Sequence, residues 1–274
     1  MVLENIFKDI IVQNYEKNPI KENNLAYHNW EHTRKVLLGA LKLEEILTAR
    51  AYLHEKDFDL LKYAALGHDL VQDFVWEEAP NKIGKIRVSK TGGNEEKSAE
   101  ETLKIVKEYT TLTAEEEVTL REAILITIPD WDEELQTAYQ PNLRTVPSYI
   151  SLCIALADLD YIGMTAEDNF VEIGNRLFKE QRLLPELKTL TTEQKKLLQQ
   201  ELNAWNARQI RFYEGRKIRF QKEIVRVSNI SWQVIAEINE LFSNFDENIA
   251  LEKEYCAKCE KMTFKELVKT FGLK

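Results

Sequence analysis

Apolar side chains recur along most of this chain at intervals of three to four residues. That spacing places them on one face of an α-helix. The pattern predicts helices over 3–16, 29–53, 57–69, 94–109, 114–128 and 148–164. A further helix is expected to start at Thr165, and the sequence after residue 191, rich in Glu, Lys, Leu and Gln, predicts long helices. No segment shows the pattern of a strand, so we expect an all-α fold without a sheet.

Two segments interrupt the helical pattern. Residues 70–93 contain one proline and three glycines, and residues 129–147 contain three prolines. Loops of this length are uncommon inside a compact domain and often carry function. Both lie between residues that are candidate metal ligands.

Two regions are expected within the 274 residues. Residues 1–165 are predicted to form a helical metal-binding core that includes the N-terminal helix. Residues 166–274 are predicted to form a helical extension of that core. The polar helices after residue 191 would either pack against the core or provide the surface of a homodimer.

Composition excludes several classes of protein. Hydrophobic residues make up 44% and charged residues 30%, as in a globular protein with a substantial core. The formal net charge of -9 disfavours binding to duplex nucleic acid, because neutralising phosphates requires clustered Lys and Arg. No run of about 18 apolar residues is present, so no membrane span is predicted. The N-terminus lacks a basic lead and an apolar signal core, and we expect a cytoplasmic protein.

Three cysteines are too few to form a disulfide framework in a chain of this length. Cys256 and Cys259 have the spacing of half a zinc site or of a redox couple. Because no second such pair exists to complete a tetrahedral site, we interpret them as reduced surface or packing thiols.

The candidate chemistry lies in two short strings that contain three of the four histidines. The first string, Tyr-His-Asn-Trp-Glu-His, places His28 and His32 one helical turn apart on the same side. In the second string His68 is followed directly by Asp69. Asp158 lies in an apolar stretch, where a lone carboxylate is costly to bury unless it is paired or bound to metal. Histidine and aspartate suit a divalent ion that keeps positions open for water and substrate, which indicates a metal-centred hydrolase.

This arrangement resembles the HD superfamily of metal-dependent phosphohydrolases, whose signature is H…HD…D on an all-helical core. The similarity covers roughly residues 24–165 and includes Asn94–Ala99, which is similar to a segment of bacterial predicted HD hydrolases. It implies an HD-type helical bundle with additional C-terminal helices. The metal ligands that the resemblance implies are His32, His68, Asp69 and Asp158.

The first string also resembles the Tyr-His-Asn-x-x-His element of cyclic-nucleotide phosphodiesterases. In that family the first histidine protonates the leaving oxygen and the second binds metal, which implies His28 as general acid and His32 as ligand. No glutamine is recognisable in the sequence as a clamp for a purine base. Two-metal HD enzymes have further histidines after the HD pair, and none follows His68 here. We therefore expect one divalent ion (Mn, Mg, Co, Ni, Fe or Zn), while carboxylates leave room for a second.

The attacking water also needs a group that orients or deprotonates it. Asp73, one turn beyond Asp69, is the leading candidate for this role. Glu95 and Glu96 are weaker candidates, because acidic side chains in the first turn of a helix are equally expected on its exposed face.

Substrate phosphates require positive charge. Residues 79–94 contain several basic side chains and no acidic one, and two more basic residues follow His32. A solvated loop and an exposed helix face would explain these positions equally well. The candidate substrate-binding residues are Arg34, Lys82, Lys85 and Arg87.

Three functions follow from these residues. The leading one is a metal-dependent phosphohydrolase acting on a nucleotide or another small phosphate ester, with monoester and diester both open. The second is a cyclic-nucleotide phosphodiesterase, which is the narrower form of the first. The third is a non-catalytic module that senses a nucleotide in the same pocket and contacts partners through its C-terminal helices.

Overall fold

The structure is a computed structural model that describes residues 2–145, 148–164, 170–226 and 230–273. Helices dominate these residues, so the predicted all-α fold is confirmed. The helix expected to begin at Thr165 starts outside the described residues. The α-helices are α1 (Val2–Ile11), α2 (Trp30–Ala49), α3 (Phe58–Gly67), α4 (Gly93–Tyr109), α5 (Ala114–Leu125), α6 (Tyr149–Leu159), α7 (Tyr161–Met164), α8 (Phe170–Gln181), α9 (Thr192–Arg226), α10 (Trp232–Leu241), α11 (Phe245–Cys259) and α12 (Phe264–Thr270).

Short irregular turns adjust the ends of several helices. A π-helical turn, Val12–Glu16, extends α1 over the rest of the segment predicted as one helix. The predicted helix over 148–164 is divided at Asp160 into α6 and α7. Turns of 3-10 helix occupy Lys21–Asn23, Glu55–Asp57, Pro141–Thr145 and Leu187–Thr189.

Side-chain caps define where two of the helices that carry the site begin. The Asn29 side chain accepts hydrogen bonds from the backbone N–H groups of Glu31 and His32, which starts α2 one residue later. The Ser148 side chain accepts from the N–H of Ser151 and starts α6 in the same way. The first cap places His32 in the first turn of α2.

The expectation of no sheet is wrong, because both long loops contain short strands. β1 (Val75–Glu78) and β2 (Lys85–Val88) form an antiparallel hairpin, and β5 (Arg182–Leu183) pairs antiparallel with β2. β3 (Asp130–Asp132) and β4 (Thr137–Tyr139) form a second hairpin. Strands of two to four residues are too short to show an alternating pattern. They form because the backbone groups of the loops need hydrogen-bond partners.

The β1–β2 turn depends on one glycine. Gly84 has a φ of 73°, and a Cβ at this position would lie 2.1 Å from the carbonyl oxygen of Leu183. Only glycine meets both requirements without strain, so Gly84 lets the hairpin lie close to β5.

The main hydrophobic core draws side chains from both of the regions expected from the sequence. It contains Leu43 of α2 and Ile154 of α6 together with Phe220 of α9 and Ile238 of α10. A smaller cluster joins Phe178, Leu202, Leu267 and their neighbours in α8, α9 and α12, and includes the fully buried Cys259. Cys153, Cys256 and Cys259 are all buried free thiols, consistent with packing positions.

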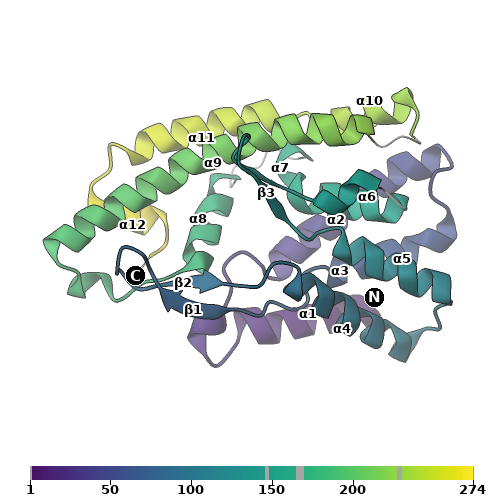
Figure 1. Cartoon of the computed structure of the whole chain (residues 1–274), viewed down its shortest axis with the longest axis horizontal. Coiled ribbons are helices and arrows are strands. Elements are labelled where there is room, and N and C mark those ends of the chain that lie inside the picture. The colour runs from purple at the N-terminus through teal and green to yellow at the C-terminus, as the bar shows by residue number, and fades with distance from the viewer. Residues whose placement is uncertain (1, 146–147, 165–169, 227–229, 274) are drawn as a thin grey trace.

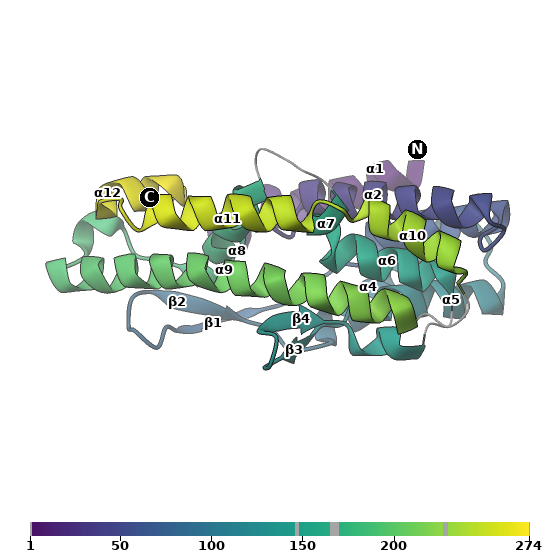
Figure 2. The same ribbon diagram turned by 90° about the horizontal axis from the view of Figure 1, so that it is seen from above.

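The helices form two groups that lie side by side. α2 packs on α3 and α6, with α4 and α5 against them, while α9 extends along the molecule and α11 packs along it (Figure 1). The view from above shows both hairpins on the same side of α9 (Figure 2).

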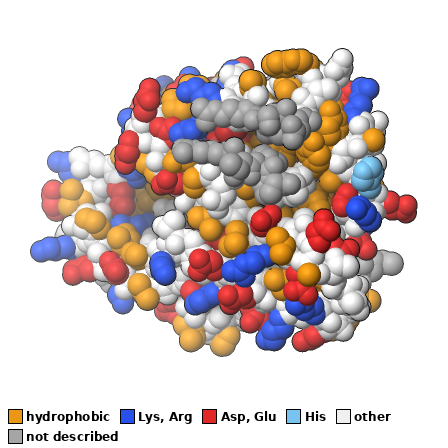
Figure 3. Space-filling view, turned by 45° about the vertical axis from the view of Figure 1, so that its right-hand side comes forward, with side chains coloured by type: hydrophobic (Ala, Val, Ile, Leu, Met, Phe, Trp, Pro, Cys, Tyr) orange, Lys and Arg blue, Asp and Glu red, His pale blue; other side chains and the backbone are white. Residues whose placement is uncertain are grey.

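On the face drawn in Figure 3, acidic and basic side chains are interspersed with apolar ones. Within the described residues, no helix has the length and apolarity to cross a membrane.

Candidate metal centre

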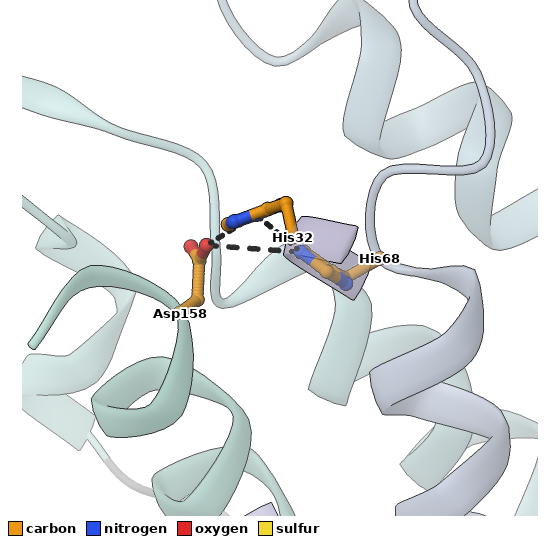
Figure 4. A group of neighbouring side chains, drawn as sticks. All are labelled: His32, His68 and Asp158. Atoms are coloured by element: carbon orange, nitrogen blue, oxygen red, sulfur yellow. Dashed lines mark hydrogen bonds and ion pairs between the residues drawn. The ribbon is translucent and has the colours of Figure 1, made fainter. Parts of the chain in front are cut away.

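Three segments far apart in the chain converge on one buried cluster. His32 comes from the first turn of α2, His68 directly follows α3, and Asp158 lies in the last turn of α6. One nitrogen or oxygen from each lies within 4.8 Å of the others, and Figure 4 shows the three side chains pointing toward one another. The two Nε2 atoms are 3.3 Å apart, and Asp158 Oδ1 lies 3.5 Å and 3.7 Å from them. This group could hold a metal ion.

Asp69 adds a second carboxylate to this cluster. Its Oδ2 lies 3.2 Å from His32 Nε2 and 3.3 Å from His68 Nε2. Ligand atoms around an ion with bonds near 2.1 Å are separated by about 3.0–3.4 Å. Asp69 and the two histidines therefore lie at separations close to those of ligands around one ion, and Asp158 adjoins both histidines from another helix.

Burial and charge make the cluster a strong site for a cation. Burial acts to lower the pKa of His32, but its hydrogen bonds with Asp158 and Asp69 outweigh burial and raise that pKa to about 9. Burial acts to raise the pKa of Asp69, but His68 and His28 hold it well below its usual range. The Asp69 carboxylate thus remains ionised and stabilises positive charge, which a divalent ion would supply.

Neighbouring groups orient three of these four side chains. The backbone carbonyl of Ala65 lies 2.8 Å from His68 Nδ1 and accepts its N–H, which leaves His68 Nε2 free to face the cluster. Gln72 donates to Asp69 Oδ1 at 3.0 Å, and Gln140 donates to Asp158 Oδ2 at 3.2 Å. Each carboxylate therefore keeps its other oxygen for the cluster. Such supporting hydrogen bonds are typical of metal sites in proteins.

The position of Asp158 is further fixed by a buried ion pair two residues away. Arg216 of α9 donates to both oxygens of Asp160 at 2.7 Å and to the carbonyl of Ala138 at 2.9 Å. Both partners are about 1% exposed. A fully desolvated pair of this kind sets the register of the elements that it joins. It ties the end of α6 to α9 and to β4.

His28 lies beside the cluster and is held by a carboxylate that sequence reasoning missed. Its Nδ1 hydrogen-bonds to Glu180, at the end of α8, and its Nε2 lies 3.9 Å from Asp69 Oδ2. The other Glu180 oxygen accepts from the backbone N–H groups of Tyr27 at 2.8 Å and His28 at 2.9 Å. Burial opposes ionisation of Glu180, yet His28 and Arg87 lower its pKa to about 2. The ring of His28 is therefore fixed by a buried anion.

Arg87 connects this carboxylate to the supporting residues of the cluster. It pairs with Glu180 and donates to the Gln72 side chain at 2.6 Å, and Gln72 in turn donates to Asp69. Its side chain is 8% exposed and lies against the ring of Phe74. Arg87, a candidate substrate-binding residue, thus points from β2 into the protein, toward α8.

A cavity of about 380 Å³ opens on the cluster. His28, His32, Asp69 and Asp158 line one part of it. The rest of the wall is formed by residues of α2, α4, α6 and α7, of the β3–β4 hairpin, and of α8 and α9. Helices of the expected C-terminal extension therefore form part of the wall.

Most of the other candidate residues lie away from the cavity wall. Arg34, Lys82 and Lys85 are exposed, and none of them lines the cavity. Asp73 is largely exposed and pairs with Lys97, whereas Glu95 in the first turn of α4 does line the cavity. The structure thus brings together the four expected ligands and His28, but not the basic residues.

Several residues of the site carried no local signal in the sequence. Glu180 is 152 positions from His28, and Gln140 is 18 positions from Asp158. Gln72 is three positions from Asp69, and this one-turn spacing is the single local feature that could have identified it.

Comparisons with known protein families, with characterised proteins and with solved structures found no match to this chain. The geometry of the cluster is compatible with an HD-type site, and the functional interpretation rests on that geometry.

Proposed function

We propose that this protein is a metal-dependent phosphohydrolase of the HD type, acting on a nucleotide or another small phosphate ester. The observation that carries the proposal is the cluster of two imidazoles and two carboxylates at the wall of a cavity, with a further histidine, His28, beside it. The ligands would be His32, His68, Asp69 and Asp158, binding one divalent ion. Their mixture of nitrogen and oxygen donors suits Mn, Fe, Co, Ni or Zn better than Mg, which prefers oxygen.

The protein groups around this site have distinct tasks in the proposed reaction. When bound, a divalent ion supplies polarisation of a phosphoryl oxygen and a water of lowered pKa. As an imidazolium whose Nδ1–H donates to Glu180, His28 would deliver its Nε2 proton to the departing oxygen. Gln72 and Gln140 keep the two aspartates in place.

Glu95 is the better candidate for orienting the attacking water. It lines the cavity, while Asp73 lies outside it in an exposed pair with Lys97. Burial, with a smaller effect from Asp69 and Asp158, raises the pKa of the Glu95 carboxyl, which favours its acting as a proton acceptor. We therefore assign to Glu95 the role that the sequence suggested for Asp73.

The cavity wall also supports the narrower hypothesis of a cyclic-nucleotide phosphodiesterase. Gln140, Gln181 and Gln209 line the cavity, although no glutamine was recognisable in the sequence as a contact for a base. Amide side chains can donate and accept, as recognition of a nucleobase edge requires. Cleavage of a cyclic mononucleotide that His28→Ala nearly abolishes would support this reading. Full activity of that variant would contradict the assigned role of His28.

Metal analysis of the purified protein, followed by a screen of phosphate esters with Mn, Mg, Co and Zn, tests the proposal. We expect bound metal in the wild type, loss of that metal in His68→Ala and no loss in His54→Asn. His54 is the exposed fourth histidine, and Asn preserves its capping position. Bound metal without turnover of any ester would favour the non-catalytic sensing module. Absence of both metal and turnover would defeat the enzyme reading.

A further inference from the structure

The charged side chains of the cavity wall nearly balance one another outside the metal cluster. Arg176 of α8 lies 2.5 Å from one Glu31 oxygen, and Lys35 lies 3.6 Å from the other. Lys35 Nζ also lies 5.6 Å from the centre of the Tyr161 ring. With Glu95, the wall thus carries two cations and two carboxylates beyond the cluster. That balance leaves little positive charge for a ligand beyond what a bound ion would add.

The basic hairpin does not supply the missing charge. Lys82 and Lys85 are exposed on the β1–β2 hairpin and do not line the cavity. Arg87 points inward and is neutralised by Glu180. Among the residues that the structure describes, this wall offers no cluster of basic side chains to a polyphosphate with about four negative charges.

The remainder of the wall is mostly apolar and aromatic. Trp131 of β3 and Phe212 of α9 both line the cavity, with ring centres 6.4 Å apart and planes inclined by 23°. Trp131 is 46% exposed, which is unusual for so large an apolar side chain. Gln209, one turn before Tyr213 on the same helix, adds a nearly buried amide to this region. Stacked rings beside an amide suit a planar, hydrogen-bonding group.

We propose that the cavity selects organic phosphates in which one phosphate is joined to a planar heteroaromatic body, and that it discriminates against polyphosphates. The inference rests on the proposed function for its phosphate subsite. In this arrangement the phosphate lies at the metal cluster and within reach of Arg176 and Lys35, and the planar body lies against Phe212 and Trp131. A volume of about 380 Å³ falls in the range of small-molecule sites.

Binding and turnover should be measured separately on the Mn-loaded full chain. The probes are adenosine 5′-monophosphate, its 3′,5′-cyclic form, adenosine triphosphate and ribose 5-phosphate. We expect at least one of the two monophosphates to bind about tenfold more tightly than ribose 5-phosphate, because one stacking contact accounts for up to about a factor of ten. We also expect it to bind more tightly than the triphosphate, whose additional negative charges would meet no further basic side chains of the described wall. Equal or tighter binding of the triphosphate, or equal binding of ribose 5-phosphate, would overturn the inference.

Variants of the aromatic wall provide the matched comparison. Phe212→Ala should weaken binding of the preferred monophosphate about tenfold and leave binding of ribose 5-phosphate unchanged. Phe212→Leu should preserve the fold but not the stacking contact, so its binding of the monophosphate should stay weak. Lys85→Ala, on the exposed hairpin, should change neither. Selective binding that depends on Phe212 without any turnover would sustain the inference and defeat the proposed hydrolase. Turnover that is unchanged by substitution of Phe212 and that favours the triphosphate would support the proposed hydrolase and overturn the inference.

Discussion

At the scale of single residues, the site is defined by which atom of each side chain faces the cluster. His68 presents Nε2 because its Nδ1 is bound to a carbonyl, and His28 presents Nε2 because its Nδ1 is bound to Glu180. The same kind of hydrogen bond thus directs one Nε2 toward the candidate metal site and the other toward Asp69, as the proposed roles of ligand and proton donor require.

Glu180→Gln tests the second of these arrangements. The amide removes the anion that holds His28, so we expect kcat to fall about 10- to 100-fold with bound metal unchanged. Steady-state kinetics together with metal analysis measures both effects. Glu186→Gln, an exposed glutamate on the following segment, is the control. Unchanged kcat in Glu180→Gln would contradict the proton-donor role of His28.

The same carboxylate predicts how stability depends on pH. The pKa of Glu180 is lowered to about 2 in the folded protein, so its stabilising effect is present above its unfolded value of about 4.5 and is lost as the pH falls toward 2. We expect this effect to reach about 3 kcal/mol. The difference in the free energy of unfolding between wild type and Glu180→Gln, measured in urea between pH 7 and pH 3, should therefore shrink toward the acid end. A difference that grows with acidity would contradict this assignment.

Glu95→Gln tests the group that we assign to the attacking water. We expect a loss in kcat of about 10²–10⁴-fold, the usual contribution of an acid–base group, with KM little changed. The pH–rate profile should also lose one limb. Glu96→Gln, the exposed neighbour on the same turn, should behave as wild type. A normal pH profile in Glu95→Gln would transfer the role to another residue.

At the scale of elements, the fold brings ends of helices together rather than their middles. The start of α2 and the ends of α3 and α6 lie at the candidate metal site, and the end of α8 lies at His28. Caps at Asn29 and Ser148 determine where two of these helices start. Ends that meet leave side chains of the terminal turns free to face a common point.

The Arg216–Asp160 pair is a buried link between the helices of the site and α9. Arg216→Leu would leave Asp160 buried without its partner, and we expect a loss of about 3–5 kcal/mol in the free energy of unfolding. Urea denaturation measures the loss, with the exposed Arg211→Leu on the same helix as control. A loss no larger than that of the control would show that the pair does not hold these elements together.

At the scale of the whole molecule, the C-terminal helices complete the site. α8 and α9 provide Glu180, Arg176 and Phe212, and side chains of α9 and α10 enter the same core as those of α2 and α6. Removal of these helices would therefore open the cavity and expose the core, rather than release an independent partner-binding module.

Metal binding should stabilise the whole fold, because its ligands come from three segments that only folding brings together. At an ion concentration of about 100 times Kd, we expect the free energy of unfolding to rise by about 2.7 kcal/mol. Thermal or urea unfolding with and without Mn measures this rise. His68→Ala should remove it, while His54→Asn should retain it. Equal stabilisation of all three proteins would place the ion elsewhere.

Local patterns in the sequence determined the helices and the residues that could bind metal. Apolar periodicity marks α2, α4 and α6, because the helical repeat requires no knowledge of distant contacts. The rarity of histidine isolated His28, His32 and His68 as candidates. The short strands of the two loops had no such signal, since their pairing depends on partners elsewhere in the chain.

Only the tertiary structure decided how these residues are used. It brought Glu180 to His28, placed Glu95 rather than Asp73 at the cavity, and turned Arg87 inward, away from solvent. These outcomes depend on how helices far apart in sequence pack together, and a hydrogen bond between distant positions leaves no mark in local spacing. The sequence therefore identified the chemistry of the cluster, and packing decided the shape and charge of the cavity beside it.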